Sequence, residues 1–289
     1  MKSGIRLEQC ILSFGASLLQ RFATIVTGAC LGMVTGLPMT EAASATPVQL
    51  IASNSMYADL AVQIGGPNVL ATVLEHGPNR QPLIQSGSIV LCGSTRADAW
   101  LRDTAQRMSP PAIVVQVPQG RYEESDNVQV PWFDVMAIST FTRALAHELT
   151  QRAPSAAQGF AGNLANTEAG FQAVSRRIAE VAKDYAGSDV IVADDLSRAV
   201  TRQLGFKAVP LSRSARSAIA QAIERREGSI FLYDRDAADP KIKELVNSAT
   251  DGGIPVVALQ EKLPRGLHYQ QWALRQWNTI HGALNEASP

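Results

Sequence analysis

The chain has 289 residues, of which 46% are hydrophobic and 18% are charged, which is enough apolar content for a sizeable core. Its 26 Lys and Arg residues balance its 26 Asp and Glu residues, so the net charge is zero. This balance argues against a nucleic-acid-binding surface and against an acidic disordered tail, and composition alone indicates only a globular protein.

The N-terminal segment has the features of an export signal. Lys2 and Arg6 precede an apolar stretch over residues 22–39, and residues 43–45 (Ala-Ser-Ala) match the small-residue pattern of a cleavage site. We therefore expect a signal peptide that is cleaved near Ala45 and a periplasmic mature protein. A membrane anchor is the alternative, although the Gly and Pro residues of the stretch disfavour a spanning helix of roughly 20 residues.

Two cysteines bear on these expectations. Cys30 would carry a lipid if the protein were a lipoprotein, but the Leu that usually stands three residues before such a cysteine is absent. After cleavage, Cys92 is the one cysteine left, and it lies in the apolar run of residues 88–93, which predicts a buried strand. We expect Cys92 to pack as a small hydrophobic residue and not to act as a catalytic thiol.

Short apolar runs alternate with longer segments of helical period after the signal, a pattern typical of α/β proteins. The apolar runs predict strands, and the segments between them predict helices. In the first half, the predicted strands are residues 48–53, 68–74, 89–92 and 112–117, and the predicted helices are residues 56–64, 98–108 and 131–149.

A long helix is predicted over residues 156–185, which contain no proline. Thirty helical residues span about 45 Å at 1.5 Å per residue, so this helix would connect two halves of the protein. The second half repeats the α/β pattern. Its predicted strands are residues 189–193, 230–233 and 255–259, and its predicted helices are residues 196–204, 241–249 and 272–284.

Four segments carry a family resemblance when they are taken in order. They are IASNSMYADLAVQIGG (residues 51–66), DAWL (98–101), the helical segment 154–187, and GIPVVALQEKLP with YQQW (253–264 and 269–272). Together they resemble the periplasmic solute-binding proteins of zinc and manganese ABC importers. Each motif alone is common, and the likeness lies in their order and spacing across nearly the whole mature chain.

The resemblance implies an α/β fold of two βα-sandwich lobes, joined by a long rigid helix, with a ligand cleft between the lobes. It also implies a protein that delivers its ligand to an inner-membrane ABC permease, acts as a monomer, binds no nucleic acid and does not itself span the membrane after signal cleavage. The corresponding division is a signal peptide (residues 1–45), an N-terminal lobe (46–155), the connecting helix (156–186) and a C-terminal lobe (187–289).

The metal ligands that the resemblance implies are only partly present. The family binds its ion through two histidines, a third His or Glu, and a final carboxylate. At the first two positions this chain has Leu83 and Gln129, and at the last two it has Asp194 and Asp234. We therefore expect any zinc or manganese ion to be held by weaker, oxygen-rich ligation at Asp194 and Asp234.

Other residues near the presumed cleft are His76 and Arg80, and they leave a second interpretation open. The chain would then be an accessory or repurposed member of the fold that has lost its metal and binds another small solute or a protein partner. Arg80 would suit an anionic ligand. Facing carboxylates at Asp194 and Asp234 would favour a cation, whereas divergent ones, with Arg80 turned inward, would favour the second interpretation.

An enzymatic function is not expected. Asp234-Arg235-Asp236 follows an apolar strand, as a phosphotransfer nucleophile and its acid would, but the rest of that machinery is missing downstream. The sequence contains no Gly-rich phosphate loop and no Gly-x-Ser-x-Gly motif.

Overall fold

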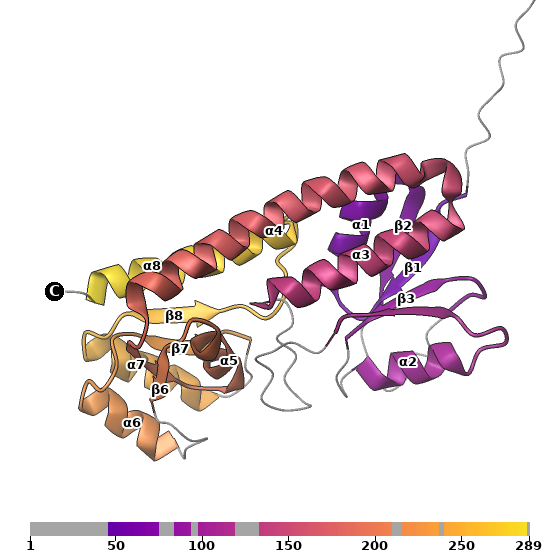
Figure 1. Cartoon of the computed structure of the whole chain (residues 1–289). Coiled ribbons are helices and arrows are strands. Elements are labelled where there is room, and N and C mark those ends of the chain that lie inside the picture. The colour runs from indigo at the N-terminus through magenta and orange to yellow at the C-terminus, as the bar shows by residue number, and fades with distance from the viewer. Residues whose placement is uncertain are drawn as a thin grey trace, which may run out of the picture. The chain divides into compact units, whose positions relative to one another are not determined.

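The computed structural model describes residues 46–74, 84–93, 98–118, 133–209, 216–236 and 240–287. Ala45–Pro289 forms one compact unit, and its framework is two four-stranded parallel sheets (Figure 1). The predicted signal peptide lies outside the described residues. Within the described ranges, no helix is both long and apolar enough to cross a membrane.

The first sheet has the strand order β2-β1-β3-β4, and all its strands are parallel. Alternate residues of its central strands face opposite helical layers. Leu50 and Leu91 pack with helices α1 and α3, whereas Ile51, Val90 and Cys92 pack with helix α2. The elements are β1 (Val48–Ala52), α1 (Ser55–Gly65), η1 (Gly66–Asn68), β2 (Val69–Val73), β3 (Ile89–Cys92), α2 (Ala99–Gln106), β4 (Ile113–Gln116) and α3 (Val135–Arg152).

Cys92 is fully buried at the end of β3, as the apolar run around it predicts. Burial, with a smaller contribution from the nearby Asp98 carboxylate, raises the pKa of the Cys92 thiol to about 12. At neutral pH the sulfur is therefore protonated, and it packs as the small hydrophobic residue expected from the sequence.

The second sheet has the order β6-β5-β7-β8, again all parallel. Val190 and Leu232 face the layer that contains α5 and α8, and Ile191 and Phe231 face α6 and α7. The elements are β5 (Asp189–Val192), α5 (Asp195–Gln203), β6 (Lys207–Val209), α6 (Arg216–Glu224), β7 (Phe231–Asp234), α7 (Pro240–Asp251), β8 (Val256–Leu259) and α8 (Tyr269–Ala287).

The two sheets share one connectivity, because in each the first strand lies between the second and third strands in chain order. The equivalence extends to single hydrogen bonds. The N–H of Ser53 donates to the carbonyl of Leu91 after β1, and the N–H of Ala193 donates to the carbonyl of Leu232 after β5, both at about 3 Å. This repeat is architectural, since the sequence itself shows no internal repeat.

Helix α4 (Ala157–Tyr185), preceded by the short η4 (Pro154–Ala156), covers the stretch for which the sequence predicts a long helix. It packs against α1 and α3 from the first half of the chain and against α8 from the second (Figure 1). The residue boundaries of the lobes, at 155 and 186, stay a prediction.

Several predicted boundaries are wrong by a few residues. The helix predicted to start at residue 131 begins at Val135, because the carboxylate of Asp134 accepts the N–H groups of Met136 and Ala137 and caps the first turn. The closing helix begins three residues earlier than predicted, at Tyr269. Strand β6 and helix α6 were not predicted. Strand β6 is three residues long and has no fully buried residue, so it lacks the apolar run that predicts a strand.

Candidate functional site

Acidic side chains gather at the carboxyl edge of the second sheet. Asp194 is the second residue after β5, Asp234 is the last residue of β7, and Glu261 is the second residue after β8. Parallel strands end at a common edge, and ligands of open α/β sheets bind in the crevice outside that edge. Asp236 joins the group from the turn after β7.

Asp194 links two strand ends through its carboxylate. One oxygen, Oδ1, accepts the N–H of Ser197 at 2.8 Å and so caps helix α5, while the Asp194 N–H donates back to the Ser197 hydroxyl at 3.2 Å. The other oxygen, Oδ2, accepts the backbone N–H of Asp234 at 2.5 Å. Asp194 is therefore the N-cap of helix α5.

Asp234 organises the turn that follows β7. Its Oδ1 accepts the N–H of Asp236 at 2.9 Å, the hydrogen bond of an Asx turn. The carboxylate of Asp236 in turn receives the N–H of Lys262 at 3.4 Å. These bonds bring the ends of β7 and β8 together and place the acidic groups near one another.

The electrostatics of this edge disfavour full ionisation. Burial raises the pKa of Asp194, and burial followed by the charges of Asp194 and Asp236 raises the pKa of Asp234. Burial, then Asp234 and Asp236, likewise raises the pKa of Glu261. Lys262 is the nearby cation that acts in the opposite direction on Asp234 and Glu261.

The arrangement is not a complete metal site among the residues that the structure describes, where no three His, Cys, Asp or Glu side chains converge to hold an ion. The Asp194 carboxylate is directed at the backbone of Asp234 and at its own helix. Each carboxylate oxygen has two lone pairs, so Asp194 and Asp234 retain acceptor capacity beyond these N–H bonds. The pair can therefore supply oxygen ligands, but further ligands must come from elsewhere.

The remaining predicted cleft residues, His76, Arg80 and Gln129, lie outside the described residues, as does Leu83. Whether Arg80 turns inward is therefore untested.

Two of the other histidines have partners away from the acidic edge. His268, whose side chain is 60% exposed, pairs with Asp59 at 2.7 Å. His281 lies on α8, where its ring contacts Tyr185 and the side chain of Asn285. These contacts tie α8 to α1 and α4 and do not involve the predicted ligands.

A second polar cluster occupies the equivalent edge of the first sheet. Asp98, only 7% exposed, accepts the hydroxyl of Ser53 at 2.8 Å and the N–H of Gly93 at 2.5 Å. Arg102 donates to the carbonyl of Gly93 at 2.7 Å. Asp98 thus binds the N–H that follows β3, just as Asp194 binds the N–H at the end of β7.

Sequence reasoning did not identify Glu261 or Asp98 as residues of these edges. Glu261 lies in the C-terminal motif and Asp98 opens the DAWL segment, so both were visible as parts of the resemblance. Their placement depends on strand order, since β8 neighbours β7 and β3 neighbours β1. An acidic residue just after a predicted strand is the signal that could have found Glu261.

Comparison with solved structures gives a consistent set of neighbours. The structure matches the solute-binding protein FpvC from Pseudomonas aeruginosa, solved with Ni²⁺, at TM-score 0.62 and 12% identity over 84% of this chain and 99% of that chain. It matches the periplasmic zinc-binding protein TroA from Treponema pallidum at TM-score 0.61 and 16% identity, over 83% and 99%. The chain has the fold of periplasmic metal-binding proteins. This confirms the predicted two-lobed α/β architecture.

The same fold occurs in the laminin-binding adhesin Lmb from Streptococcus agalactiae, in a mutant structure that matches at TM-score 0.64 and 14% identity over 82% of this chain and 99% of that chain. At such identities the likeness concerns the fold of the periplasmic metal-binding proteins and not their ligands. No family model matches the sequence, and no curated protein matches it.

Proposed function

We propose that the protein is a periplasmic solute-binding protein that delivers its ligand to an ABC permease in the inner membrane. The observation that carries this proposal is the match over 99% of the length of the solute-binding protein FpvC and of the periplasmic zinc-binding protein TroA. The N-terminal charged and apolar pattern, with its small-residue cleavage motif, supports export. In this proposal the chain binds its ligand and releases it to the permease, and it catalyses no reaction.

The ligand in this proposal is a divalent cation bound at the acidic edge, with Asp194 and Asp234 among its ligands. The raised pKa values there reflect carboxylates that are desolvated and that repel one another. A bound cation would offset both the cost of burying these charges and their mutual repulsion. Carboxylate oxygens suit Mn²⁺ well, and Zn²⁺ accepts them together with other donors. Without the two imidazoles, we expect affinity below that of a histidine-based zinc site.

A second candidate keeps the fold and replaces the ligand. Leu83 and Gln129 stand where the resemblance places histidines, and both oxygens of Asp194 already accept backbone N–H groups. These observations favour an accessory protein that binds another small solute or a protein partner in the same cleft. Its contacts would then include His76, Arg80 and Gln129.

Thermal unfolding of residues 46–289 after chelation tests the cation directly. A ligand that binds only the folded state stabilises it by about 2.7 kcal/mol at a hundredfold excess over Kd. For a chain of this size that shift corresponds to roughly 5–10 °C in Tm. We expect Mn²⁺ or Zn²⁺ to raise the Tm of the native chain and to raise the Tm of Asp234→Asn much less. Asparagine keeps the side-chain oxygen that accepts the Asp236 N–H.

Asp184→Asn is the matched control, because Asp184 is an exposed carboxylate in the last turn of α4. It should respond to the ions as the native chain does. No shift with any divalent ion would contradict the cation and leave the second candidate, whose ligand should then be sought among small anions and periplasmic proteins.

A further inference from the structure

The outer edge of strand β2 is open among the described residues. β2 stands first in the order β2-β1-β3-β4 and pairs along its whole length with β1, from Val48↔Val69 to Ala52↔Val73. It packs chiefly on β1 and α1, and no other described strand lies beyond it. An open edge presents backbone N–H and C=O groups to which another strand can pair.

The hydrogen bonds to β1 show which residues of β2 face the sheet. The N–H of Leu74, the residue after β2, donates to the carbonyl of Ala52 at the end of β1. Backbone groups alternate in direction along a strand, so those of Thr72 and Leu70 also point to β1. The groups of the residues between them point away from the sheet.

These outward residues are Val69, Ala71 and Val73. One of their N–H groups is already used, since that of Val69 donates to the carbonyl of Gly66. The N–H groups of Ala71 and Val73, and the carbonyls of all the outward residues, stay available to a partner strand.

Exposed apolar side chains are concentrated at this edge. Leu70 is 55% exposed and Val73 is 38% exposed, and Val62 on the adjoining helix α1 is 47% exposed. They are three of the four large hydrophobic side chains that are exposed among the described residues. Exposed apolar groups that gather in one place are typical of a surface that contacts another protein.

β2 also lacks the residues that protect an open edge. Lysine and proline on an edge strand discourage pairing with another chain. β6, which holds the equivalent position in the second sheet, begins with the exposed Lys207, whereas β2 (Val-Leu-Ala-Thr-Val) contains no charge and no proline. The edge of the first sheet is therefore the one suited to accept a strand.

We propose that β2 pairs antiparallel with β2 of a second copy of the chain, with the two-fold axis at Ala71, so that two sheets become one. A two-fold interface must be self-complementary. The outward groups are spaced evenly about Ala71, so Ala71 meets its own copy and Val69 meets Val73 of the partner subunit. Leu70 then lies opposite Thr72 of the partner subunit, and no like charges meet across the axis.

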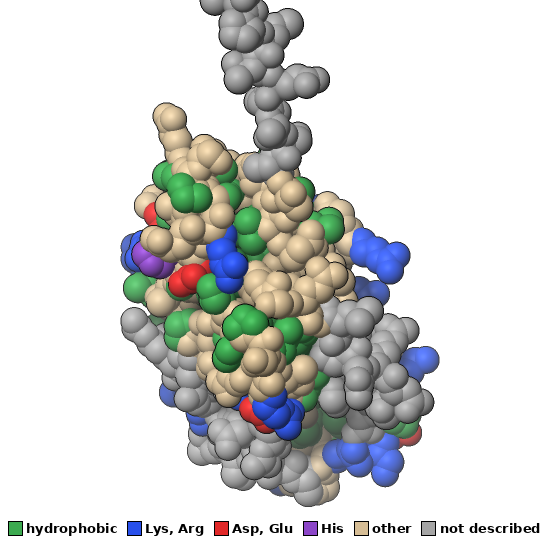
Figure 2. All heavy atoms as spheres, turned by 90° about the vertical axis from the view of Figure 1, so that its right-hand side faces the viewer, with side chains coloured by type: hydrophobic (Ala, Val, Ile, Leu, Met, Phe, Trp, Pro, Cys, Tyr) green, Lys and Arg blue, Asp and Glu red, His purple; other side chains and the backbone are tan. Residues whose placement is uncertain are grey.

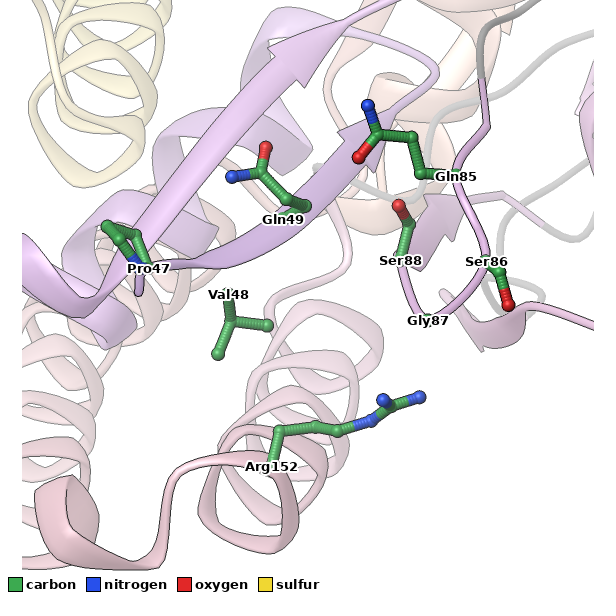
Figure 3. Close-up of a pocket in the computed structure, with 8 residues that line it drawn as sticks. All are labelled: Pro47, Val48, Gln49, Gln85, Ser86, Gly87, Ser88 and Arg152. Atoms are coloured by element: carbon green, nitrogen blue, oxygen red, sulfur yellow. The ribbon is translucent and has the colours of Figure 1, made fainter. Parts of the chain in front are cut away.

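The surroundings of β2 permit this approach. β2 is parallel to β1 and begins on the side that Figure 2 shows, where the Lys and Arg side chains of the described residues lie apart. A hollow of about 300 Å³ at the start of β1 is lined by β1, the turn before β3 and Arg152 (Figure 3). No residue of β2 lines it, so what β2 offers a partner is its backbone and not that cavity.

Sedimentation velocity of residues 46–289, from micromolar to millimolar concentration, tests the proposal. We expect a reversible and weak dimer, because five residues per copy are few beside the roughly 20–30 of a standard interface. Ala71→Pro removes an outward N–H but no hydrogen bond to β1, and Thr72→Lys adds a charge to the edge. Each should raise the dimer Kd by about tenfold or more. Gln172→Lys, which adds the same charge on the exposed face of α4, should leave it unchanged.

Cysteine cross-linking tests the position of the axis. The Cα atoms of a hydrogen-bonded antiparallel pair lie about 5.5 Å apart, which is within the range of a disulfide. Ala71→Cys should therefore form a disulfide-linked dimer when oxidised glutathione is added. Leu70→Cys would face a different residue of the partner subunit and should form much less. Cys92 is fully buried and should not react.

A chain that stays monomeric over the whole concentration range would overturn the proposal, and so would a dimer that persists in both Ala71→Pro and Thr72→Lys. Equal cross-linking of Ala71→Cys and Leu70→Cys would exclude the axis at Ala71 and overturn it as well. The proposal departs from the monomer that the family resemblance implies. It does not depend on the proposed function, because the acidic edge belongs to the second sheet.

Discussion

At the scale of single residues, the carboxylate of Asp194 connects three segments of the second sheet. It caps α5 through the N–H of Ser197 and accepts the N–H of Asp234 at the end of β7. A side chain with this role is needed for folding whether or not it also binds a ligand. Its removal therefore mixes a structural effect with any effect on binding.

Asp194→Ala should lower the free energy of unfolding by about 2 kcal/mol, because it removes an N-cap and leaves the Asp234 N–H without its acceptor. Asp194→Asn should cost less, since asparagine is an equally good cap. Urea unfolding measures both, with Asp184→Ala as an exposed-carboxylate control. An Asp194→Ala chain as stable as the control would show that these hydrogen bonds contribute little.

The acidic edge should also make stability depend on pH. The raised pKa values of Asp194, Asp234 and Glu261 mean that the folded chain retains protons that the unfolded chain has lost. The stability that these groups contribute is therefore greatest below about pH 4, which is their pKa in the unfolded chain. It falls as the pH rises through their pKa values in the folded chain. Asp234→Asn should make the urea midpoint less dependent on pH above about 4, and an equally steep dependence in this variant would contradict the assignment.

At the scale of elements, the close packing of α4 against α8 depends on one glycine. A Cβ at Gly170 would lie 2.7 Å from Cγ of Gln270, whereas a Cβ at Gly162, in the same helix, would meet nothing within 4 Å. Alanine is favoured over glycine in a helix interior by about 1 kcal/mol. Gly162→Ala should therefore stabilise the chain by up to about 1 kcal/mol, and Gly170→Ala should lose that gain to the contact with Gln270.

Thermal or urea unfolding of the two variants distinguishes the effects. Equal stabilisation by both substitutions would mean that α8 moves away from α4 at no cost. The comparison is direct because both glycines lie within α4 and differ mainly in what surrounds them.

Helix α8 is also fixed at its first turn by a residue of α1. The Asp59 carboxylate, 13% exposed, accepts the N–H of Tyr269 at 2.9 Å, and it also pairs with His268 and Gln63. Asp59→Ala should cost about 1–3 kcal/mol, because the buried N–H of Tyr269 loses its acceptor. His268→Ala should cost less than about 1 kcal/mol, since the His268 ring is mostly exposed. Urea unfolding gives both values, and similar losses would contradict this order.

The elements that sequence predicted best are those whose pattern is unambiguous. The apolar runs of β3 and β7 and the proline-free α4 were found within a few residues. Strand β6 carries no such pattern, and its pairing with β5 is a tertiary effect. For the site, Asp194 and Asp234 were named from sequence, whereas the proximity of Glu261 requires the strand order. His76, Arg80 and Gln129 stay predictions.

At the scale of the whole molecule, the two sheets repeat one connectivity and carry polar clusters at corresponding edges. At the carboxyl edge of the first sheet, Asp98 accepts a hydrogen bond from the Gly93 N–H. At that of the second sheet, Asp194 accepts one from the Asp234 N–H. Only the second edge combines several carboxylates with raised pKa values among the described residues. This asymmetry is the reason why we propose the second sheet for the cation.

Binding of a divalent cation at Asp194 and Asp234 can be tested by the metal content of residues 46–289 at equilibrium. The chain would be dialysed at neutral pH against micromolar Mn²⁺ or Zn²⁺, and bound metal per chain measured by elemental analysis. We expect one ion per chain in the native protein and in Asp184→Asn, and much less metal in Asp234→Asn. Metal content no higher in the native protein than in Asp234→Asn would contradict this expectation.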